Sequence, residues 1–210
     1  MISITNNYFR ILITSALLSL TGSAHAWILA ISPGAKQIYI QVGNGTYTGG
    51  NHNVGGAPAN NPTINVVSVN VPAATLGNGS PQAMTSNSTA ANSFLDGFNV
   101  CNPPSQVYIG GWVRVPGTTG SGVMTVTTPA NLVNVAGNTI PFSSISWAST
   151  ANGNATAHIA AGTFTGGSIT LANIAANTWV ENCMVFSFAN SSIYAAGTYT
   201  GRAVYTLSLP

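Results

Sequence analysis

Apolar residues alternate with polar ones along several short stretches of the chain, at the period of two that is typical of strands half buried against a core. Residues 36–42 place Ile38, Ile40 and Val42 on one face of such a strand. Pro or Gly turn signals separate this stretch from the others. The further predicted strands cover 63–71, 106–115, 122–128, 131–135, 142–149, 168–172, 178–188 and 198–209.

Helix signals are nearly absent, because few long polar helix formers occur and Gly, Thr, Asn, Ser and Val dominate the sequence. Many short strands with turns between them favour an all-β sandwich with Greek-key connections. In 63–71 the apolar parity shifts at Val67, which predicts a bulge. Residues 43–61 are rich in Gly and Asn and are interpreted as a flexible loop or linker.

A second weakly patterned stretch runs from 73 to 99 and consists mostly of Ala, Asn, Ser and Thr. A loop of that length is uncommon inside a compact domain. Either it contains a strand around 94–100, or it presents a feature of the surface.

The first 26 residues have the pattern of a secretory signal peptide. Arg10 precedes an apolar run of ten residues, 11–20, and the stretch closes on Ala24-His25-Ala26. A membrane anchor is the alternative, but ten residues fall short of the roughly 20 that span a bilayer. We therefore expect export, cleavage after Ala26, and no transmembrane span in the remaining chain.

Only 3% of the residues are charged, whereas soluble domains typically carry about 25%. The apolar fraction of 45% excludes disorder driven by charge, and so few cations make nucleic-acid binding untenable. After cleavage the net charge is +1, which favours self-association over a dispersed monomer. The charged side chains that then remain are Lys36, Arg114 and Arg202 against Asp96 and Glu181.

Two cysteines, Cys101 and Cys183, occur in a chain expected to be exported. An even count in an oxidising compartment predicts one disulfide. A bridge across about 80 residues contributes roughly 4.5 kcal/mol by loss of chain entropy in the unfolded state. No motif spacing supplies further ligands for a metal, so we expect neither a metal site nor a cofactor.

Catalytic machinery is not expected either. A pair of carboxylates for hydrolysis would have to be Asp96 and Glu181. A Ser-His-Asp arrangement would need Asp96 with His52 or His158, and the sequence has no Gly-x-Ser-x-Gly elbow to expose the serine. Residues 43–48 begin like the Gly-x-Gly-x-x-Gly fingerprint of dinucleotide-binding proteins, but the third glycine is missing and no helix is expected to follow. The sequence thus predicts a protein that is not an enzyme.

Aromatic side chains leave room for a second interpretation. Trp112, Trp147 and Trp179 all lie in strand patterns, and aromatic faces can stack on sugars. Burial in the core of a sandwich is the commoner fate of such residues. The alternative function is therefore a carbohydrate-binding or adhesin module, and a monomeric periplasmic domain is a third.

The end of the chain carries a resemblance to a known group of proteins. The turn Gly197-Thr198-Tyr199 enters an alternating strand that ends at Pro210. This resembles the ending of secreted bacterial fimbrial subunits, in particular the spore-coat-U-like and chaperone–usher pilin families. The signal peptide, the single cysteine pair and the strand-rich body agree with it.

The resemblance implies an incomplete immunoglobulin-like domain, here 46–210, whose groove receives the N-terminal extension of the next subunit. Residues 27–45 are the candidate extension, with Ile38, Ile40 and Val42 as the inserted row. The rival row is Trp27, Leu29 and Ile31.

The alternative to strand donation is that 36–42 pairs within its own domain as an ordinary first strand. The expected function is a subunit of an extracellular fibre, pilus or coat, with other copies of itself as partners. The resemblance adds a periplasmic chaperone and an outer-membrane assembly protein to those partners.

Overall fold

The computed structural model describes residues 36–45, 47–48, 57–58, 64–93, 96–115, 120–151 and 156–209. All of them belong to one compact unit. The predicted signal peptide, the row formed by Trp27, Leu29 and Ile31, and most of 46–63 lie outside the described residues.

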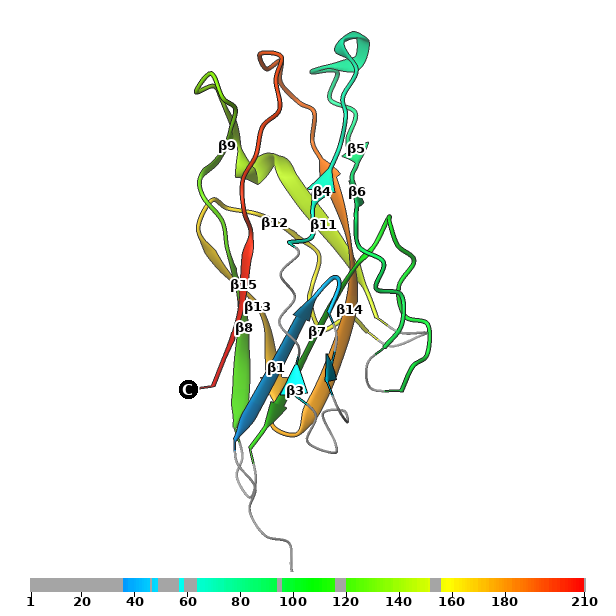
Figure 1. Ribbon diagram of the computed structural model, residues 1–210. Coiled ribbons are helices and arrows are strands. Elements are labelled where there is room, and N and C mark those ends of the chain that lie inside the picture. Colours follow the sequence, from blue (N-terminus) through cyan, green and yellow to red (C-terminus); the bar gives the residue numbers. More distant parts are fainter. Residues whose placement is uncertain are drawn as a thin grey trace, which may run out of the picture. The chain divides into compact units, whose positions relative to one another are not determined.

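Two antiparallel sheets form the body of this unit (Figure 1). The larger sheet has the strand order β1 (Gln37–Val42), β7 (Val107–Arg114), β14 (Thr178–Phe188), β11 (Ile145–Thr150) and β12 (Gly162–Thr163), and β5 (Gln82–Ala83) pairs with β14 beyond the end of β7. The smaller sheet has the order β13 (Ser168–Ala175), β8 (Ser121–Thr127) and β15 (Val204–Ser208).

Short elements complete the described chain. Three two-stranded sheets pair β2 (Tyr47–Thr48) with β3 (Ala57–Pro58), β4 (Val67–Ser68) with β6 (Thr85–Ser86), and β9 (Asn131–Val133) with β10 (Thr139–Pro141). Two single 3-10 turns cover Ala73–Thr75 and Phe142–Ser144. In the part of the chain that the structure describes, no helix is long and apolar enough to cross a bilayer.

The core lies between the two sheets, because alternate residues of each strand point inward. Ile109 and Val113 of β7 and Met124 and Val126 of β8 are fully buried, as is Ile174 of β13. These residues belong to a single hydrophobic cluster drawn from both sheets. The predicted all-β sandwich is confirmed.

Some predicted strand limits are wrong. The stretch 63–71 pairs only at β4, and its other described residues form no ladder. Residues 142–144 form a 3-10 turn rather than the start of a strand. At the end of the chain the strand begins at Val204, and Thr200 makes only an isolated bridge with Val133.

The stretch 73–99 is organised without long strands. It holds the first 3-10 turn, β5 and β6, and a single bridge between Asn92 and Asn99. The strand considered around 94–100 is therefore reduced to that bridge within the described residues. Among the described residues between β6 and Val100, that bridge is the only strand pairing.

Candidate functional site

The predicted donor segment forms β1, an edge strand of the larger sheet. It pairs antiparallel with β7 of the same chain over six residues, from Gln37 opposite Arg114 to Val42 opposite Ile109. This is the arrangement of an ordinary first strand. In the single chain the segment thus fills its own sheet edge, and donation to another copy stays a prediction.

Two of the three residues of the predicted apolar row of β1 face the core. Ile40 and Val42 are half buried against the main hydrophobic cluster. Ile38 is 44% exposed, so the end of β1 nearest Lys36 is covered least. Through Ile40 and Val42, β1 therefore covers the edge of the hydrophobic core on this side of the sandwich.

The opposite face of β1 is buried as well, which the alternation did not predict. The Tyr39 hydroxyl donates to Gln41 Oε1 at 2.6 Å, and Gln41 Nε2 donates to the Gly43 carbonyl at 2.7 Å. The Tyr39 ring stacks on Trp179 with centroids 5.5 Å apart. The burial of this face is explained by the aromatic residues of the neighbouring strands, because Trp112 of β7 lies opposite both Tyr39 of β1 and Trp179 of β14. These aromatic residues were the sequence signal that could have indicated it.

The edge strands on this side of the sandwich carry no charge. β1 lies against β15, the edge strand of the smaller sheet, and neither strand contains a charged residue or a proline. Proteins commonly protect exposed sheet edges with lysine, proline or bulges. The far edge of the smaller sheet has such a bulge in β13 between Thr170 and Ala172, whereas β1 and β15 have none in their ladders.

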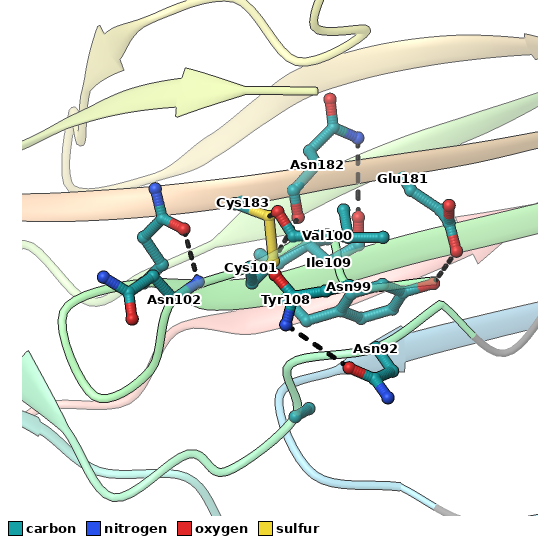
Figure 2. Close-up of a disulfide and its surroundings, with 12 residues drawn as sticks. Asn92, Asn99, Val100, Cys101, Asn102, Tyr108, Ile109, Glu181, Asn182 and Cys183 are labelled. Atoms are coloured by element: carbon teal, nitrogen blue, oxygen red, sulfur yellow. Dashed lines mark hydrogen bonds between the residues drawn. A yellow bond between two sulfur atoms is a disulfide. The ribbon is translucent and has the colours of Figure 1, made fainter. Parts of the chain in front are cut away.

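The predicted disulfide between Cys101 and Cys183 is present, with the two Cα atoms 5.5 Å apart (Figure 2). It joins the chain just before β7 to the middle of β14 on the outer face of the larger sheet. Cys101 is 2% exposed and Cys183 is fully buried. Together with Tyr108 they form a small second core.

The two carboxylates considered as a catalytic pair have separate partners. Asp96 accepts a hydrogen bond from the Phe98 N–H within its own turn. Glu181 accepts one from the Tyr108 hydroxyl at 2.7 Å. Burial, together with this bond, raises the pKa of Tyr108 well above its usual value.

The histidines do not join them. His158 contributes its backbone N–H to Asn182, and His52 lies outside the described residues. No group of three metal-ligating side chains occurs among the residues with described positions.

The three tryptophans of the strands differ in setting. Trp147 is buried, donates its ring N–H to the Ala160 carbonyl at 2.8 Å, and packs on Phe164. Trp112 and Trp179 are half buried on the outer face of the larger sheet. The Tyr39 stack already occupies one side of Trp179.

Comparison with known proteins identifies no relative. No family model, no curated protein and no solved structure matches this chain.

Proposed function

We propose that this chain is an exported, immunoglobulin-like structural subunit that joins other copies into an extracellular fibre or coat. The joint is the exchange of β1, so that the strand of one copy pairs with β7 of the next. The supporting observation is that β1 is an uncharged, largely apolar edge strand held in its sheet by one ladder, to β7.

Exchange preserves the interactions that the single chain makes. The six-residue register between Gln37 and Val42 on β1 and its partners on β7 can form equally well between two copies. Ile40 and Val42 then cover the core of the neighbour instead of their own. The exchange must therefore offset mainly the entropy that two copies lose when they associate, while the net charge of +1 expected after cleavage leaves little repulsion between them.

A head-to-tail joint of this kind is heterologous, so it builds an open chain of subunits when the rotation from one copy to the next does not close a ring. Each subunit gives one strand and accepts one. Once formed, the joint is released only when a six-residue ladder and its packed side chains separate, which favours slow dissociation.

Register-matched cysteines test the exchange directly. Gln37 and Arg114 lie opposite each other in the ladder, and directly opposite Cα atoms in antiparallel strands are about 4.5–5.5 Å apart, within reach of a disulfide. One preparation carries Gln37→Cys and another carries Arg114→Cys. The two are mixed, unfolded in urea without reductant, refolded together and oxidised.

Covalent dimers that contain one copy of each variant are expected on non-reducing denaturing gels. The double variant in one chain is the matched control, and it shows that the pair can bridge when both residues are in register. If the double variant bridges internally while the mixture gives no mixed dimer, β1 is not exchanged and the proposal is wrong. Electron microscopy of the refolded wild-type chain reports whether the joints continue into fibres.

A further inference from the structure

The two ends of β1 are held differently. At its start, Lys36 and Gln37 are exposed, and Ile38 is 44% exposed. Just beyond its far end, Gly43 is buried and donates its N–H to the Tyr108 carbonyl at 2.7 Å. The far end of the strand is thus covered and paired, whereas its start is open to solvent.

The side chain of Asn65 adds a second fastening at the far end. Its Nδ2 donates to the Val42 carbonyl at 2.8 Å, and its Oδ1 accepts the Asn44 N–H at 3.2 Å. One amide therefore satisfies two backbone groups, one on either side of Gly43. These bonds join the end of β1 to a segment outside its own sheet.

Asn44 extends the connection to a third segment. Its Oδ1 accepts the Thr89 N–H at 2.7 Å, the Thr89 hydroxyl at 3.2 Å and the Ser88 hydroxyl at 3.3 Å. The end of β1 is thereby tied both to Asn65 and to residues 88–89. We call the side chains of Asn44 and Asn65 the amide clamp.

Gly43 shows how closely the clamp encloses the chain. Its φ of +63° lies in the left-handed region, which glycine adopts without strain. A Cβ at this position would lie 2.5 Å from Cγ of Asn65. The turn after β1 therefore packs directly on the clamp.

We propose that the amide clamp is a kinetic latch on β1, which opens last and so sets how fast the strand leaves its sheet. This inference rests on the proposed exchange of β1. The Val42 carbonyl that Asn65 binds belongs to the strand, so β1 cannot pass to another copy until the clamp opens. Release begins at the Ile38 end, because that end is covered least.

The latch acts on the rate of exchange and not on its extent. In an exchanged pair, Asn65 of the accepting copy can bind the same Val42 and Asn44 groups of the donated strand. Equal bonds in the two states cancel in the equilibrium between them, but they must break before the strand is released. The latch therefore keeps single chains closed and exchanged chains joined.

Mixing under native conditions measures the rate. The Gln37→Cys and Arg114→Cys chains are combined without urea, and mixed disulfide dimers are quantified over time, with and without Asn65→Ala in both chains. Loss of the two hydrogen bonds of Asn65 is expected to speed their formation by about tenfold or more. Asn134→Ala is the matched control, because Asn134 Oδ1 also accepts two backbone N–H groups, between β9 and β10. It should change the rate by less than about twofold.

Two further measurements separate the latch from a general loss of stability. Hydrogen exchange of the Gly43 amide, followed by NMR, should accelerate about tenfold in Asn65→Ala and stay unchanged in Asn134→Ala. The fraction of exchanged dimers after refolding, measured by native mass spectrometry, should differ from that of the wild-type chain by less than about twofold. Asn65→Asp keeps the size of the side chain but loses the donor to the Val42 carbonyl, and it gives the same test if Asn65→Ala does not fold.

The outcomes distinguish the latch from the exchange. Mixed dimers that form equally fast with and without the Asn65 change would overturn the latch and leave the exchange standing. Equal acceleration by Asn134→Ala, or unchanged protection of the Gly43 amide in the Asn65 variant, would overturn the latch as well. Absence of mixed dimers in every background, after refolding too, would refute the exchange of β1 and with it the role of the latch.

Discussion

The Tyr108 hydroxyl and the Glu181 carboxylate are joined by a 2.7 Å hydrogen bond that runs diagonally across the β7–β14 ladder (Figure 2). Directly opposite Glu181 is Gly110, and a Cβ there would lie 2.6 Å from the Tyr108 hydroxyl oxygen. The tyrosine ring therefore occupies the space that the glycine leaves open. This relationship fixes the outer face of the larger sheet beside the disulfide.

Loss of that hydrogen bond should destabilise the fold measurably. Tyr108→Phe is expected to lower the free energy of unfolding by about 1–2 kcal/mol, because it removes a hydrogen bond to a charged group at a fully buried side chain. Urea denaturation followed by tryptophan fluorescence measures it. Tyr199→Phe is the control, since that hydroxyl bonds a carbonyl on an exposed loop, and an equal loss there would contradict the argument.

Alkaline pH should weaken the same region. Burial first, and the bond to Glu181 second, raise the pKa of Tyr108 above the value of about 10 of an unfolded chain. The folded state thus holds this proton more tightly, and the resulting stability is complete below about pH 10 and declines as the pH rises further. Urea midpoints between pH 8 and 11.5 are expected to fall. The fall should be shallower in Tyr108→Phe, and identical slopes would refute the assignment.

A methyl group at Gly110 should displace the tyrosine. Gly110→Ala is expected to cost about 1–3 kcal/mol of unfolding free energy, because the ring is enclosed and cannot move without leaving Glu181. Thermal unfolding by circular dichroism provides the measurement. Gly167→Ala is the matched change, where the nearest atom to an added Cβ is Thr165 Oγ1 at 4.0 Å, and it should be close to neutral.

The disulfide should resist reduction until the protein unfolds. Cys101 and Cys183 are almost completely buried, so dithiothreitol reaches them only through opening of the structure. Thiol labelling over time, with and without urea, distinguishes slow native reduction from rapid reduction after unfolding. The double change to serine is expected to cost about 2–5 kcal/mol. Rapid labelling in the absence of urea would show that the outer face opens readily.

Asn190 should be intolerant of a change that preserves its size. Its side-chain nitrogen lies 2.9 Å from both the Thr75 carbonyl and Asn78 Oδ1, so both positions require a donor. Asn190→Asp places an acceptor against two acceptors and is expected to cost about 2–4 kcal/mol, measured by urea denaturation. Asn78→Asp, an exposed change of the same kind, should cost much less.

The strands that were predicted well are those whose alternation continues through a long pairing. In β7 and β14 inward positions are mostly apolar at every second residue, with Asn182 the buried polar exception in β14, and the observed limits differ from the expected ones by at most one residue. The prediction of a strand over 63–71 was wrong outside β4, because side-chain hydrogen bonds rather than a backbone ladder hold the described part of this segment. Asn65 bonds the Val42 carbonyl, and Asn87 Oδ1 accepts the Val66 N–H. Such amide contacts leave no periodic trace in the sequence.

The candidate site shows the same division. The alternation predicted that Ile38, Ile40 and Val42 share one face of a strand; Ile40 and Val42 pack against the core, whereas Ile38 is exposed, and insertion of the row into another copy stays a prediction. The burial of Tyr39 and Gln41 on the other face was not predicted, since it depends on residues of β7 and β14 that are distant in sequence. The pairing of the cysteines followed from their number, but the position of Glu181 beside them required the register of the ladder.

The bridge between Cys101 and Cys183 has a mechanical consequence for any assembly that is pulled lengthwise. Its two ends are separated by 82 positions along the chain. The disulfide therefore prevents about 270–300 Å of polypeptide between the two cysteines from extending when the chain is pulled from outside this segment. When force is applied to the chain at points on either side of the bridge, only the stretches outside 101–183 can therefore lengthen, which limits how far the subunit can extend.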